Sequence, residues 1–118
     1  MVQLFTQLDI GEYVMNNKLL YIKTLKGKYF NIDKIECFWV KEYFMLDGTY
    51  NIMIDIAGRE ESCFLVEQIK NKETAQTLLD AIIKLIMDVQ EHYSYLIIDL
   101  ETIINAEKIN PFQDEEEN

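Results

Sequence analysis

Apolar residues recur at three- and four-residue spacing between Asn71 and Gln90, in the most regular pattern of the chain. This period places them on one face of an α-helix. Asn71 suits the N-cap position, since its side-chain oxygen can accept a hydrogen bond from a first-turn N–H. The apolar positions are Ala75, Leu78, Leu79, Ile82, Ile86 and Val89. We therefore predict one long amphipathic helix over residues 71–90, which needs another element to cover.

Short segments rich in β-branched and aromatic residues precede this helix and are separated by turn residues. The clearest is Tyr50–Ile56, where tyrosine or isoleucine occupies every second position and predicts a strand with one apolar face. Further strands are predicted over residues 18–25, 28–32, 35–44 and 61–67. Strands in succession followed by a helix favour an antiparallel meander of about five strands, covered on one face.

The predicted core places the helix on the last two of these strands. In this interpretation Leu78, Leu79, Ile82 and Ile86 pack against Ile52, Ile54, Phe64 and Val66.

The segment from His92 to Lys108 allows two interpretations. Tyr93–Leu100 has the composition of a strand, whereas its apolar residues and those that follow would also share a helix face, with Asp99 or Ser94 as the cap. Leucine, glutamate and alanine in the later half favour a second, C-terminal helix. We predict a single α+β domain over residues 1–110, with an extended arm or irregular strand in residues 1–17. Residues 111–118 are predicted to be a disordered acidic tail.

The charge balance narrows the range of partners. Lys and Arg number 11 against 21 Asp and Glu, giving a net charge of −10. This balance argues against direct nucleic-acid binding, which requires a basic surface, and permits a basic protein partner. Asp9 and Glu12 interrupt the N-terminal apolar residues, and no apolar run approaches the roughly 18 residues of a membrane span. We expect a cytoplasmic protein without membrane contact, in which Cys37 and Cys63 are reduced and partly buried in strands.

The sequence offers little that suggests catalysis. His92 is the only histidine, and no glycine-rich phosphate loop or CxxC, HExxH or GxSxG motif is present. We therefore expect no enzymatic activity, no catalytic residues, no cofactor and no metal. The alternative is a small-ligand-binding or enzymatic domain with a site between sheet and helix.

Aromatic residues crowd one short stretch of the chain. Phe38 and Trp39 are adjacent and must face opposite sides of a strand, so one ring remains outside the core between sheet and helix. A second covering layer would explain this, and so would a partner surface, where Trp and Tyr are enriched. The candidate interaction residues are Trp39, Tyr43, Phe44, Asp47, Asp55, Glu60, Glu61 and Glu67.

The pattern from Lys18 to Ile35 is a strand, a Lys-Gly turn and a second strand ending in Ile-Asp-Lys-Ile. It contains no diagnostic residues but resembles small bacterial or prophage-encoded domains, some of which are pleckstrin-homology-like sheets capped by a helix. The leading hypothesis is a non-catalytic protein-interaction module, phage-related, acting through an acidic and aromatic surface. In a sharper form, Asp47, Asp55, Glu60, Glu61 and Glu67 make one patch that mimics nucleic acid. A second alternative is a structural subunit of a homo-oligomer, such as a homodimer with Trp39 or Tyr43 at its interface.

Overall fold

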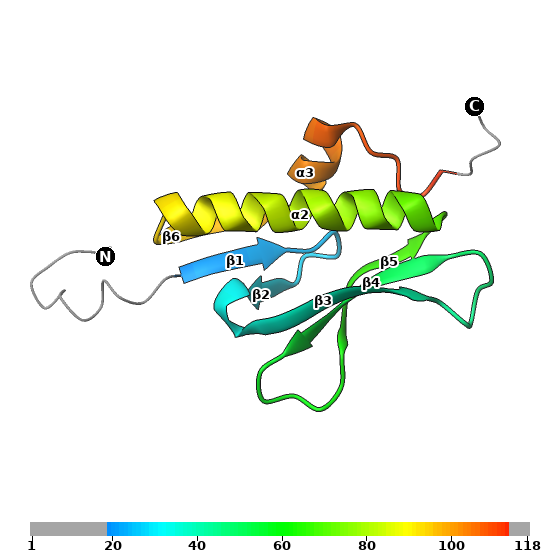
Figure 1. Cartoon of the computed structure of the whole chain (residues 1–118), viewed down its shortest axis with the longest axis horizontal. Coiled ribbons are helices and arrows are strands. Elements are labelled where there is room, and N and C mark those ends of the chain that lie inside the picture. The colour runs from blue at the N-terminus through cyan, green and yellow to red at the C-terminus, as the bar shows by residue number, and fades with distance from the viewer. Residues whose placement is uncertain (1–18, 114–118) are drawn as a thin grey trace, which may run out of the picture.

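The computed structural model describes residues 19–113, which form two three-stranded sheets and two α-helices (Figure 1). The β1 sheet has the order β2-β1-β6 and comprises β1 (Leu19–Lys23), β2 (Tyr29–Asn31) and β6 (Tyr95–Asp99). The β4 sheet has the order β3-β4-β5 and comprises β3 (Ile35–Glu42), β4 (Tyr50–Ile56) and β5 (Cys63–Ile69). The helices are α2 (Lys72–His92) and α3 (Leu100–Glu107). The predicted α+β class is confirmed, whereas the predictions for residues 1–17 and 114–118 fall outside the described residues.

The predicted single five-stranded meander is wrong. A 3-10 turn at Ile32–Lys34 separates β2 from β3, and Asn31 Oδ1 accepts a hydrogen bond from the Asp33 N–H at 2.9 Å. After this turn the chain leaves the β1 sheet and begins the β4 sheet. It returns as β6, which pairs in parallel with β1 from Leu19 opposite Tyr95 to Lys23 opposite Asp99. Parallel strands require a crossover connection, and the β4 sheet and α2 together provide it.

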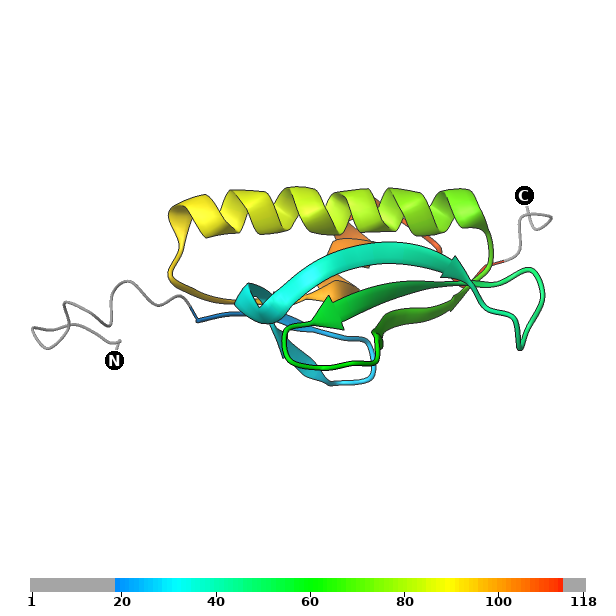
Figure 2. The ribbon, with the colours of Figure 1, turned by 60° about the horizontal axis from the view of Figure 1, so that its bottom comes forward.

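The long helix forms as predicted. Asn71 is its N-cap, with Oδ1 accepting a hydrogen bond from the Thr74 N–H at 2.8 Å. All six apolar positions of the predicted face are buried. α2 packs against the three strands of the β4 sheet and against α3, and Figure 2 shows it as a layer over the strands. The same continuous core includes Leu20, Ile22 and Ile98 from the β1 sheet and Leu100 and Ile103 from α3.

The second predicted helix is correct only for its later half. Residues 95–99 form β6, and α3 begins at Leu100. Asp99 caps α3, because its Oδ1 accepts a hydrogen bond from the Glu101 N–H at 3.0 Å. The apolar run therefore divides between a strand that pairs with β1 and a short helix that packs on α2.

Strand β5 departs from simple alternation, which corrects one predicted core residue. Ile52 pairs with Val66 but Met53 pairs with Phe64, so one extra residue lies on β5 between these pairs. Such a bulge changes the face on which the following side chains lie. Val66 and Leu65 are consequently buried, whereas Phe64 is 46% exposed and outside the core. The other predicted core residues, on β4 and α2, are buried.

A second irregularity in β5 is held by a buried polar side chain. Tyr50 pairs with Ile69 while Ile52 pairs with Val66, and Gln68 in this interval has a left-handed backbone with φ 61°. Asn51 is 1% exposed, and its Oδ1 accepts a hydrogen bond from the Gln68 N–H at 2.9 Å. Asn51 thus satisfies a backbone group that the bulge removes from the sheet.

The ordered fold extends past the predicted domain boundary. Pro111 is buried, and its C=O accepts a hydrogen bond from the Lys70 N–H at 2.8 Å. Residues 111–113, predicted to be part of a disordered tail, therefore belong to the fold.

Candidate functional site

The β3–β4 connection is a closely hydrogen-bonded loop. The Tyr43 N–H donates to the Thr49 C=O at 2.9 Å, and the Leu46 N–H donates to the Tyr43 C=O at 3.1 Å. Thr49 is 3% exposed, and its hydroxyl donates to the Leu46 C=O at 2.7 Å. Gly48 supplies the positive φ, 81°, that the turn requires. These bonds hold the loop in one conformation although it projects beyond the sheet.

Three consecutive large apolar side chains are exposed on this loop. Phe44 is 76% exposed, Met45 66% and Leu46 45%. Tyr43 is half-buried at the base and contacts Phe44 edge to face, with ring centroids 6.4 Å apart. We call Tyr43–Leu46 the apolar loop. A run of exposed apolar residues is costly in water and is normally retained for function, so this loop is the strongest candidate for a docking surface.

Trp39 lies on the same side of β3 as the base of the apolar loop. Phe38 and Val40 pack against the core, so strand alternation places Trp39, Lys41 and Tyr43 on the opposite face. Trp39 pairs with Met53, which in turn pairs with Phe64, giving an apolar row across the three strands. Lys41 Nζ lies 5.9 Å from the centre of the Trp39 ring, within cation–π distance. The face of the β4 sheet away from α2 is therefore partly aromatic.

The five candidate carboxylates do not gather in one patch. Asp47 precedes β4 in the apolar-loop connection, whereas Glu60 and Glu61 follow β4 in the next turn. Seven residues of strand, about 20 Å, separate these two turns. Asp55 accepts a hydrogen bond from the Ser62 hydroxyl, and Glu67 forms an ion pair with Lys26 at 3.1 Å. Only Asp47 accompanies the apolar loop.

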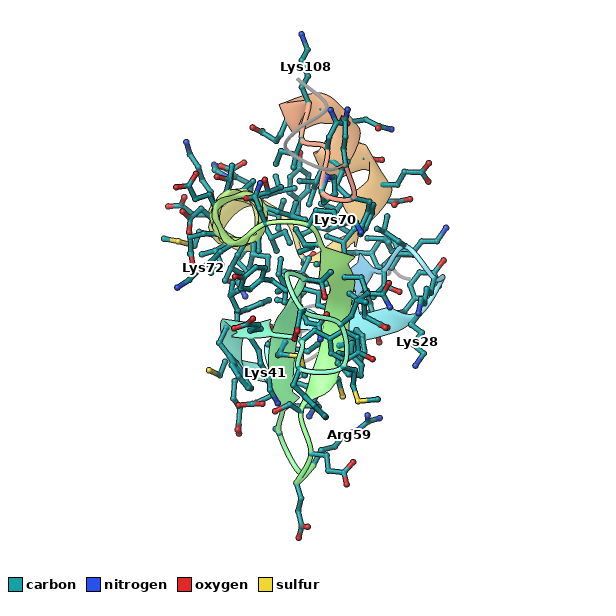
Figure 3. All side chains as sticks on the ribbon, turned by 90° about the vertical axis from the view of Figure 1, so that its right-hand side faces the viewer. Lys28, Lys41, Arg59, Lys70, Lys72 and Lys108 are labelled. Carbon is teal, nitrogen blue, oxygen red and sulfur yellow. The ribbon has the colours of Figure 1, made fainter. Side chains whose placement is uncertain are left out.

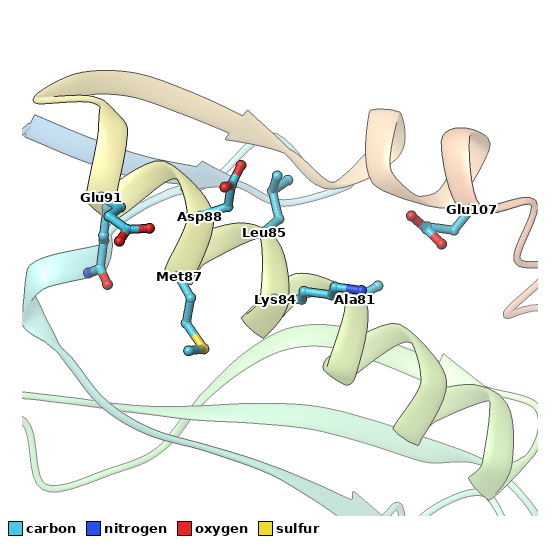
Figure 4. Close-up of a pocket in the computed structure, with 8 residues that line it drawn as sticks. Ala81, Lys84, Leu85, Met87, Asp88, Glu91 and Glu107 are labelled. Carbon is cyan, nitrogen blue, oxygen red and sulfur yellow. The ribbon is translucent and has the colours of Figure 1, made fainter.

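Buried apolar side chains such as Leu78 and Ile82 fill the space between α2 and the β4 sheet. A shallow hollow of about 870 Å³ instead lies on the outer side of α2, beside Glu107 of α3 (Figure 4). It is lined by Lys84, Met87, Asp88 and Glu91, among others. Its lining contains no Ser, Thr, Cys or His side chain.

The remaining reactive groups are scattered. His92 lies in the last turn of α2, where its Nδ1 is 3.0 Å from the Asp88 C=O. Cys63 is half-buried in β5, while Cys37 is exposed in β3 rather than partly buried as predicted. In residues 19–113 no group of three or more His, Cys, Asp or Glu side chains is arranged to hold a metal ion.

The candidates predicted from the sequence include Tyr43, Phe44 and Asp47 but not Met45 and Leu46, which the structure shows exposed beside them. The sequence does contain a signal for their exposure. Met45 and Leu46 are apolar residues that lie between two predicted strands, directly before an Asp-Gly turn. Across the described residues, no helix is both long and apolar enough to cross a membrane. The chain matches no protein-family model, no curated protein and no solved structure.

Proposed function

We propose that the protein is a non-catalytic interaction module of the cytoplasm that docks on a protein partner through the apolar loop. The observation that carries this proposal is the exposure of Phe44, Met45 and Leu46 on a loop fixed by its own hydrogen bonds. A flexible loop must lose conformational freedom on binding, whereas a preorganised loop avoids most of that cost.

The size of these side chains is sufficient for a binding hot spot. Full burial of a Phe, Met or Leu side chain contributes roughly 1.5–3 kcal/mol. Phe44 and Met45 have most of their surface still exposed, so a partner pocket would recover most of that amount for each. Aromatic anchors that enter a pocket commonly dominate the affinity of an interface.

The charge of the chain favours a protein over an anionic membrane as the partner. A net charge of −10 opposes approach to acidic lipid surfaces. We do not propose a nucleic-acid-mimicking surface, because Asp47 lies before β4 whereas Glu60 and Glu61 follow its other end, so the carboxylates of that hypothesis form no single patch.

Affinity capture from the native host with matched variants tests the proposal. Met45 and Met87 are each 66% exposed, one on the apolar loop and the other on α2. Phe44→Gln and Met45→Gln should each lose the captured partner, whereas Met87→Gln should retain it. Circular dichroism checks that all three variants are folded. A partner retained equally by all of them would contradict docking through the loop.

A further inference from the structure

A second surface, independent of the apolar loop, lies between the two sheets. It is a groove of about 880 Å³ formed by the β1–β2 hairpin on one side and β5 on the other, with Phe112 among its lining residues. β2 and β5 are edge strands of their sheets. Edge strands present backbone N–H and C=O groups that no strand of their own sheet pairs. No residue of the apolar loop lines this groove.

The groove concentrates positive charge in an otherwise acidic protein. Its lining contains four of the 11 basic residues but a single carboxylate, Glu67. The basic residues are Lys26, Lys28, Arg59 and Lys70. Figure 3 shows three of them, with Lys70 and Arg59 far apart and Lys28 to one side. The local charge is therefore opposite in sign to that of the whole chain, and it favours an anionic ligand.

One of these basic side chains, Lys26, forms only an exposed ion pair with the rest of the protein. Lys26 Nζ lies 3.1 Å from Glu67 Oε2, and this pair links the β1–β2 hairpin to β5 across the groove. The Lys26 side chain is 70% exposed and that of Glu67 29%. Exposed ion pairs contribute little to stability, so a ligand carboxylate can replace Glu67 at small cost.

Aromatic rings supply apolar contact area along the same groove. Tyr29, Phe64 and Phe112 come from three separate segments and are 52%, 46% and 47% exposed. Half-exposed aromatic side chains next to fixed charges are typical of surfaces that bind peptides, where rings provide area and cations provide orientation.

The spacing of the charges indicates an extended ligand. Arg59 lies in the turn between β4 and β5, and its Nη1 donates to Sγ of Cys63, the first residue of β5, at 3.3 Å. Lys70 directly follows the end of β5. The seven residues of β5, about 20 Å of strand, separate the Arg59 guanidinium at one end from Lys70 at the other. One small anion cannot contact both ends, whereas an extended peptide of about six residues can. We propose that this groove binds an extended acidic peptide segment, containing an aromatic or large apolar residue, of a partner protein. The peptide lies beside the sheet edges in the manner of an added strand.

A titration with a defined peptide tests this proposal on the full chain. The probe is a fluorescein-labelled peptide, Asp-Glu-Phe-Glu-Asp-Leu, and its control carries Asn and Gln in place of Asp and Glu. Fluorescence anisotropy at low salt should show binding of the acidic peptide, and the control peptide should bind much more weakly. No binding of the acidic peptide at millimolar concentration would overturn the proposal.

Charge-matched variants separate the groove from the net charge of the protein. Lys28→Glu combined with Lys70→Glu reverses two groove charges, and Lys72→Glu combined with Lys84→Glu makes the same change on exposed positions of α2. The groove variant should bind the acidic peptide about tenfold more weakly, with the α2 variant unchanged. Circular dichroism confirms that both variants are folded. Equal losses in the two variants would overturn the proposal, as would tighter binding of a labelled single-stranded oligonucleotide than of the peptide.

Discussion

Replacement of Ile82 by alanine tests the packing of α2 most sharply. Ile82 is 0% exposed at the centre of α2, within the core shared with both sheets. The substitution removes every side-chain carbon beyond Cβ, and each buried methylene-sized group contributes about 0.8 kcal/mol through transfer from water. The cavity that remains adds to this loss, so we expect a decrease in unfolding free energy of about 2–5 kcal/mol.

Urea denaturation followed by circular dichroism measures this decrease. With a denaturant slope of about 1–3 kcal/mol per molar, the midpoint should fall by on the order of 1–2 M. Thr77→Ala is the matched control, because Thr77 is an exposed residue of the same helix. Its midpoint should change little or rise slightly, since alanine favours helix more than threonine does. An Ile82→Ala midpoint equal to that of the wild type would refute the packing of α2 on the sheets.

Three further predictions address the bulge, the tail and self-association. Asn51→Ala should lower the unfolding free energy by about 1–3 kcal/mol, because it leaves the Gln68 N–H without its acceptor, and an unchanged denaturation midpoint would argue against that role. Deletion of residues 114–118 should leave the melting temperature nearly unchanged, since this segment has no apolar side chain, and a large decrease would show that it is tied to the fold. We also expect a homodimer with Trp39 or Tyr43 near its interface, so light scattering at micromolar concentration should give twice 14.0 kDa. A mass near 14.0 kDa excludes the dimer, and Trp39 fluorescence that does not shift on dissociation excludes that interface.

The elements that the sequence predicts well are those specified by local pattern. α2 has a sustained apolar period and an N-cap, and Tyr50–Ile56 alternates cleanly, so both form at the expected positions. The division of the chain into two sheets depends on β6 pairing with β1, a contact between residues more than 70 positions apart. Apolar side chains of β6 suit a strand and a helix equally well, and only the pairing with β1 decides between them.

The candidate sites also differ in whether a local sequence pattern indicates them or only contacts between distant segments do. The apolar loop is a short continuous stretch, and its aromatic members were recognisable from the sequence alone. The groove between the β1–β2 hairpin and β5 combines basic residues 26, 28, 59 and 70 from distant segments, so no local sequence pattern indicates it. The exposure of Phe64 follows from the bulge in β5, which strand alternation does not predict.

Photo-crosslinking from the apolar loop tests the central proposal most directly. A benzophenone amino acid is placed at position 45 and, as the control, at position 87, because Met45 and Met87 are equally exposed. The two proteins are expressed and irradiated in the native host. The proposal predicts a discrete protein adduct from position 45 that is absent from position 87. Identical adducts from both positions, or none from position 45, would contradict docking through the apolar loop.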